Sequence, residues 1–190
     1  VLIRLTPGID PHTYEAVNTG KVDSKFGTPI ETGQAEELIA HALTLHGIEL
    51  EGFHCHVGSQ LFEVGPLTDT ADLMLDFISH IRTTLGYTAK TLDLGGGFGV
   101  RYVESDPEMD IDGCIALLAE HIIARCKQYG IPQPRIILEP GRSIVADAGV
   151  TVYTVLNTKH IRGYKSYVTI DGGMTDNPRY ALYGSQYTCL

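Results

Sequence analysis

The chain lacks paired cysteines, an excess of basic residues and any long apolar run. None of its four cysteines belongs to a C-x-x-C pair, which argues against a zinc knuckle or a disulfide framework and favours a reducing, cytoplasmic setting. Asp and Glu number 23 against 14 Lys and Arg, a formal net charge of −9, which disfavours nucleic acid and anionic lipid as partners. No apolar run approaches the roughly 18 to 20 residues of a membrane span. We therefore expect a soluble, cytoplasmic protein.

What is present is an alternation of helix-like and strand-like segments. Apolar residues recur at helical spacing in three segments, which are residues 35–46, 68–85 and 112–129. Each is followed by a glycine suited to end a helix, namely Gly47, Gly86 or Gly130. Short apolar runs separate them, at residues 1–5, 48–53, 91–94 and 136–138. Such runs are typical of parallel strands buried on both faces, in a (β/α) barrel or a doubly wound sheet.

The pattern changes after Gly149. Residues 150–159 and 166–171 are consecutive strand-like segments without a helix between them, joined by a polar turn around 160–163. We therefore expect an α/β domain over residues 1–149 and the beginning of an antiparallel β domain over residues 150–190. Because the chain does not begin with Met, we also expect it to be a piece of a longer protein.

Glycine and polar residues follow three of the expected strands directly. These clusters are residues 54–60, 95–99 and 139–143. The carboxyl ends of parallel strands meet at one rim, where ligands bind in such folds, so the clusters are expected to share one site. The Gly95–Gly97 triplet is either a flexible turn or a row of backbone N–H groups that approach an anion. Arg142 and Ser143 would suit the same phosphate or a carboxylate.

His54 and His56 are two residues apart at a strand end, so they can point to the same side. Three interpretations remain open. The histidines could bind a metal with Asp93, Glu139 or Asp171, they could be satisfied interior residues, or one could stack on a flat aromatic ligand whose anionic tail Ser59 binds.

Two further groups contain charged residues. Glu139 follows the apolar run 136–138, where a buried carboxylate needs a partner, and Arg142 is one candidate. Alternatively, Glu139 keeps the ring nitrogen of a ligand protonated. Arg179 and Tyr183 are four residues apart, so on a helix they would face the same way and hold a carboxylate, unless they are simply solvated.

Five motifs carry a resemblance to a known family. They are TGKVDSKFG (19–27), HCHVGSQ (54–60), LDLGGGFGVRY (92–102), ILEPGRSIV (137–145) and DGGMTDNPRYALYG (171–184). In this order they resemble the alanine-racemase-like, pyridoxal-phosphate-dependent decarboxylases, and the last motif resembles the diaminopimelate branch of that family. The resemblance implies the later part of a pyridoxal-phosphate-binding (β/α)8 barrel followed by the start of a C-terminal antiparallel β domain.

The resemblance also implies roles for individual residues. Those implied to surround pyridoxal 5'-phosphate are His56, Ser59, Gly95, Gly96, Gly97, Glu139, Gly141 and Arg142. Among them His56 would stack on the ring and Glu139 would keep the ring nitrogen protonated. Those implied to contact substrate carboxylates are Arg142, Arg179 and Tyr183.

The implied reaction is decarboxylation of meso-2,6-diaminopimelate to L-lysine, the last step of lysine biosynthesis, by a homodimer. Tyr14 and Tyr180 stand where many members carry His and Pro. The Schiff-base lysine of the family is expected before the first residue, and a Cys-Glu motif and a cofactor-contacting Tyr after the last, so neither Lys25 nor Cys189 takes those roles. The chain then corresponds to roughly the middle half of an enzyme, and we expect it to be inactive alone.

Three alternatives stay open. An ornithine or arginine decarboxylase of the same family shares the first four motifs in looser form. A metal-dependent barrel hydrolase would use His54 and His56 with Asp93 or Asp171. A non-catalytic pyridoxal-phosphate-binding homeostasis protein is also a barrel, but it lacks the β domain expected here after residue 149.

Overall fold

The computed structural model describes residues 1–9 and 22–190. Tyr14 and residues 19–21 of the first motif therefore lie outside the described residues. In the part described, no helix combines the length and the hydropathy needed to cross a membrane.

A five-stranded parallel sheet forms the core of the larger part of the structure. Its strands are β1 (Leu2–Thr6), β2 (Thr28–Pro29), β3 (Gly52–His54), β4 (Thr91–Asp93) and β5 (Arg135–Ile137), in the order β2-β1-β3-β4-β5. Every neighbouring pair runs parallel. The predicted α/β architecture is confirmed, although β3 begins four residues later than the apolar run from residue 48 suggested.

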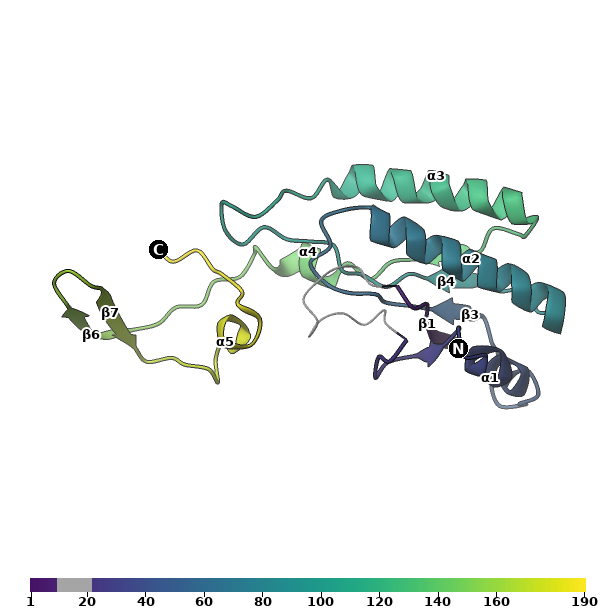
Figure 1. Ribbon diagram of the computed structural model, residues 1–190, viewed down its shortest axis with the longest axis horizontal. Coiled ribbons are helices and arrows are strands. Elements are labelled where there is room, and N and C mark those ends of the chain that lie inside the picture. The colour runs from purple at the N-terminus through teal and green to yellow at the C-terminus, as the bar shows by residue number, and fades with distance from the viewer. Residues whose placement is uncertain (10–21) are drawn as a thin grey trace.

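Three longer helices accompany the strands: α1 (Gln34–Ala42), α2 (Gly65–Leu85) and α3 (Ile111–Tyr129). Figure 1 shows α2 and α3 side by side along the sheet. The Asp110 carboxylate caps α3 by accepting the Gly113 N–H at 2.9 Å, and Gly86 and Gly130 end α2 and α3 in the left-handed conformation, at φ 68° and 62°.

The predicted end of the first helix is wrong. That helix stops at Ala42, and its C-cap is Leu43 rather than Gly47. The Thr44 N–H bonds the carbonyl of His41 at 2.9 Å, and the Thr44 hydroxyl donates to the same oxygen at 2.7 Å. These short-range bonds tighten the chain into a turn before the glycine is reached.

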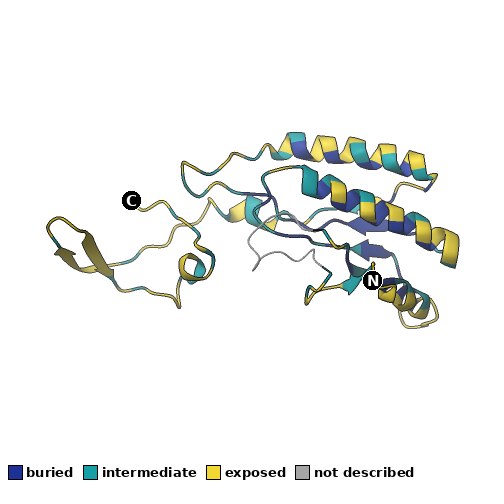
Figure 2. Ribbon diagram, viewed as in Figure 1, coloured by how far each residue is buried: buried dark blue, intermediate teal, exposed yellow. Residues whose placement is uncertain are grey.

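Strand register separates an apolar face from a polar face. Phe53 is in register with Leu92 of β4, and its ring lies 5.9 Å from that of Phe77 on α2, so this face packs on the helices (Figure 2). Because side chains alternate along a strand, the next residues, His54 and Asp93, lie on the opposite face at the carboxyl ends of their strands.

The remainder of the chain forms a smaller, exposed part. Strands β6 (Val155–His160) and β7 (Ser166–Ile170) pair antiparallel, and β6 begins five residues later than predicted. Figure 1 shows this hairpin well apart from the parallel sheet. Two short helices that the sequence analysis did not predict, α4 (Gly141–Val145) and α5 (Arg179–Tyr183), flank it in sequence.

Candidate functional site

The loops after β3, β4 and β5 meet at the carboxyl ends of these strands. The Leu61 N–H donates to the Gly97 carbonyl at 2.9 Å, which joins the first loop to the second. The Glu139 N–H donates to the Gly95 carbonyl at 2.7 Å, which joins the second loop to the third. The structure therefore brings the three sequence-distant clusters together, as expected for parallel strands. We call this meeting point the rim.

The glycine triplet allows this close approach. A Cβ on Gly96 would collide with the carbonyl oxygen of Glu139, and a Cβ on Gly97 would collide with that of Gly58. Gly95 and Gly97 also have φ angles of 69° and 111°, in the region that favours glycine. The triplet is therefore an ordered junction between backbones rather than a flexible turn.

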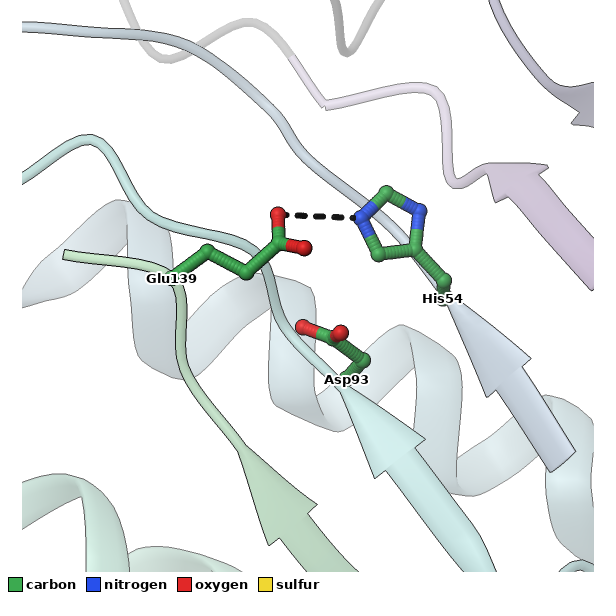
Figure 3. A group of neighbouring side chains, drawn as sticks. All are labelled: His54, Asp93 and Glu139. Carbon is green, nitrogen blue, oxygen red and sulfur yellow. Dashed lines mark hydrogen bonds and ion pairs between the residues drawn. The ribbon is translucent and has the colours of Figure 1, made fainter. Parts of the chain in front are cut away.

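His54 and Asp93, at the ends of β3 and β4, and Glu139, on the loop after β5, point toward one another (Figure 3). One ligand atom from each lies within 4.8 Å of the others. His54 Nε2 is 3.4 Å from Glu139 Oε2, and Asp93 Oδ1 accepts the Gly95 N–H at 2.9 Å. This geometry can hold a cation, and it equally supplies carboxylates to a ligand that carries a proton.

The structure corrects the sequence-based view of Glu139. The strand ends at Ile137, so the carboxylate extends beyond it onto the rim, and its side chain is 55% exposed rather than buried. Its side-chain neighbour is His54, whereas Arg142, the partner suggested by sequence, donates to the Tyr102 hydroxyl at 2.9 Å.

His56 lies beside the glycine junction. Its Nδ1 accepts the Gly96 N–H at 3.3 Å. Burial lowers the pKa of the imidazole, and the charges of Arg4 and His54 lower it further against the opposing effect of Glu139. A neutral imidazole at neutral pH is a flat, weakly polar surface suited to stacking on an aromatic ring.

Sequence reasoning missed two residues near the rim. Arg4 is in register with His54 across β1 and β3. Side chains alternate along a strand, so Arg4 lies on the same face of β1 as Thr6, two residues later. This alternation is the signal that could have indicated Arg4. Tyr102 accepts the Arg142 hydrogen bond. It is the last residue of the motif 92–102, but the sequence analysis gave it no role of its own.

Arg142 is held at the start of α4. The Gly141 N–H donates to the Glu139 carbonyl at 2.8 Å, which ties this helix to the rim. One guanidinium nitrogen of Arg142 bonds to Tyr102, while its Nε is buried and has no hydrogen-bond partner among the described residues. A buried, unsatisfied N–H of a cation indicates a place for an anion.

The other predicted site residues differ in position. Ser59 is half-buried on the loop after β3, next to the residue that the glycine junction contacts. The guanidinium carbon of Arg179 lies 5.6 Å from the Tyr183 ring centroid, so these two share a side of α5 as their spacing predicted. Figure 1 shows α5 apart from the strand ends, so the structure does not bring Arg179 and Tyr183 to the rim.

Asp171 accepts the Thr154 N–H at 2.8 Å near the hairpin and takes no part in the His54 cluster.

Relatives of known identity resemble the whole of this chain. The diaminopimelate decarboxylase of Bacillus subtilis is 41% identical over 187 residues, covering 98% of this chain and 43% of the relative. That of Staphylococcus aureus is 41% identical over 190 residues, covering 100% and 44%. A crystal structure of diaminopimelate decarboxylase from M. jannaschii in co-complex with L-lysine matches with a TM-score of 0.81 and 33% identity, covering 99% of this chain and 42% of that one.

The chain thus spans less than half the length of these relatives. Solved structures of diaminopimelate decarboxylases match the fold of this chain, and they identify its parallel sheet and helices as part of a pyridoxal-phosphate decarboxylase barrel. A family model described as the pyridoxal-binding domain of pyridoxal-dependent decarboxylases matches residues 1–146, which include the rim. The chain therefore belongs to the pyridoxal-dependent decarboxylase family.

Proposed function

We propose that the complete protein decarboxylates meso-2,6-diaminopimelate to L-lysine with pyridoxal 5'-phosphate. The observation that carries the proposal is the convergence of His56, the 95–97 glycines and Glu139 at one rim. The proposal is also supported by relatives named diaminopimelate decarboxylase at 35 to 42% identity, and by a matching structure described as a complex with L-lysine.

The residues of the rim fit the cofactor. Pyridoxal phosphate supplies a protonated pyridine ring that withdraws the electron pair left behind when carbon dioxide departs. His56 offers a neutral ring to stack against, and the exposed Glu139 carboxylate would accept a hydrogen bond from the ring N–H and so keep the ring nitrogen protonated. The N–H groups of Gly95, Gly96 and Gly141 donate to Asp93 Oδ1, His56 Nδ1 and the Glu139 carbonyl in this structure. We therefore assign the phosphate to the Gly97 N–H and the Ser59 hydroxyl.

The substrate requires a second anion site. Meso-2,6-diaminopimelate has two amino-acid ends, so an enzyme that removes one carboxyl group must hold the other. We assign this role to Arg142 at the rim, because a guanidinium fork binds a carboxylate through two parallel hydrogen bonds. The family resemblance adds Arg179 and Tyr183, which lie on α5 apart from the rim in this structure. Ornithine lacks the distal carboxylate and would leave these groups unpaired, which disfavours it strongly.

The test is carbon dioxide release and lysine formation from diaminopimelate by the complete protein. We expect Glu139→Gln to lower kcat by about 100-fold or more, because an amide cannot hold the ring nitrogen protonated. The matched control is Glu63→Gln, an exposed carboxylate on the loop before α2. Ornithine turnover at the same efficiency would favour the ornithine branch, and activity that chelators abolish and Zn²⁺ restores would favour a metal hydrolase at His54, Asp93 and Glu139.

We also propose a domain boundary near residue 150, a homodimer and a cytoplasmic location. The boundary is supported by the family match that ends at residue 146 and by the change to antiparallel pairing after it. The four free cysteines support a reducing compartment. Sedimentation of the complete protein tests the dimer, and fractionation of the producing cells tests the location.

A further inference from the structure

Tyr102 joins three segments that are distant in sequence. It lies on the loop between β4 and α3, and its hydroxyl accepts a hydrogen bond from Arg142 Nη1 at 2.9 Å. The Arg142 guanidinium carbon also lies 6.0 Å from the Tyr102 ring centroid. From the C-terminal end of the chain, the Tyr187 ring meets Tyr102 edge-on with centroids 5.5 Å apart, and the Thr188 hydroxyl donates to the Tyr102 carbonyl at 2.9 Å.

The position of Tyr102 is fixed independently of the arginine. Its backbone N–H donates to Asp106 Oδ2 at 2.9 Å, and the same oxygen accepts the Val103 N–H at 3.2 Å. With the contacts from Tyr187 and Thr188, both the backbone and the ring of Tyr102 are restrained. A phenol held in this way can orient a flexible partner at little entropic cost, because its own freedom is already lost.

The contact with Tyr102 uses one N–H of the Arg142 guanidinium. A guanidinium has five N–H groups in a planar fork. Tyr102 occupies one on Nη1, and the buried Nε has no hydrogen-bond partner within residues 1–9 and 22–190. The hydrogen bond to Tyr102 restricts rotation of the guanidinium. An anion that binds at the Nε edge therefore meets a donor group whose orientation is already set.

We infer that Tyr102 is the positioning residue of Arg142: its hydroxyl orients the guanidinium so that the free Nε edge faces a substrate carboxylate. This inference rests on the proposed function, in which Arg142 binds the distal carboxylate of diaminopimelate. Tyr102 itself touches no reacting atom and acts only through Arg142.

The experiment compares two Tyr→Phe variants in the complete protein. Tyr102→Phe removes the hydroxyl and keeps the ring, and it raises the KM for diaminopimelate about tenfold, the loss of one hydrogen bond to a charged group, with kcat within about twofold. The matched control is Tyr87→Phe, which removes the phenol bond to the Leu50 carbonyl at 3.0 Å behind the sheet. It lowers the melting temperature and leaves KM unchanged. An unchanged KM in Tyr102→Phe would overturn the inference, as would an equal rise in both variants.

A double-substitution cycle separates positioning from general damage. Arg142→Lys loses the planar fork, so adding Tyr102→Phe to it raises KM no further, whereas independent effects would multiply and contradict the inference. The Nε–H NMR signal of Arg142, recorded without substrate, provides a readout that does not depend on activity. We expect this signal to broaden in Tyr102→Phe, because the guanidinium becomes more mobile, and to stay sharp in Tyr87→Phe. If this change appears in a protein that does not decarboxylate diaminopimelate, the proposed function fails while the positioning stands.

Discussion

Gly96 is the most demanding position in the site, and Gly96→Ala tests it directly. The added Cβ would lie 2.8 Å from the Glu139 carbonyl carbon and collide with the oxygen bonded to it. Both neighbours are backbone, and the loops are joined by the Glu139 N–H to Gly95 carbonyl bond of 2.7 Å. Relief therefore requires the loops to separate, which breaks that bond. An overpacking cost of about 1 to 3 kcal/mol and one lost hydrogen bond of about 1 kcal/mol suggest a loss of about 2 to 4 kcal/mol.

The assay is urea denaturation of the complete protein, with a separate titration of pyridoxal phosphate followed by the change in absorbance of the bound cofactor. Gly149→Ala is the control, because its Cβ would meet nothing within 4 Å. We expect Gly96→Ala to lose both stability and cofactor affinity, since the same separation displaces His56 and Glu139. If Gly96→Ala matches Gly149→Ala in both measurements, the close junction described at the rim is wrong.

Two predictions concern ionisation. Burial and the Arg4 charge lower the pKa of His56 below its ordinary 6.5, so its NMR titration is expected below that value and to move back toward it in Arg4→Gln; an unmoved titration would contradict the assignment. Burial raises the pKa of Asp72, but hydrogen bonds from Arg125 and His121 outweigh this effect and lower the pKa from 3.8. The carboxylate therefore stabilises the contact between α2 and α3 fully above about pH 4, and this stabilisation is lost as the pH falls further. Asp72→Asn should cost up to about 1 kcal/mol at pH 7 and flatten the acid limb of a stability profile, whereas Asp69→Asn, an exposed position on α2, should leave it intact.

The sequence predicted the elements whose causes are local. Apolar spacing and left-handed glycines located α2 and α3, because the same residues that fill the core also set the helical period. Strand positions followed from short apolar runs between helices. The convergence of the three loops was predictable as well, because parallel strands bring their carboxyl ends to one edge whatever the length of the connections between them.

The missed features depend on contacts between distant segments. The sequence analysis offered both His54 and Arg142 as neighbours of Glu139. Nothing near Glu139 in sequence decides between them, since that choice depends on where β5 ends relative to β3. Tyr102 gains its importance only from α4 and the C-terminal segment. The first helix shows the opposite error. Glycine commonly ends helices, which predicted an end at Gly47, but this helix ends at Ala42, where the Thr44 hydroxyl bonds the backbone one turn back.

The register of the short strands links the core to the site. Phe53 and Leu92 pack toward the helices with no exposed surface, and the residues that follow them, His54 and Asp93, face the rim in the same register. A one-residue shift of β3 against β4 would place Phe53 on the rim and His54 against Phe77. The hydrophobic free energy that fixes Phe53 in place therefore also fixes the direction of His54, so a substitution that loosens the core behind the sheet is expected to disturb the chemistry in front of it.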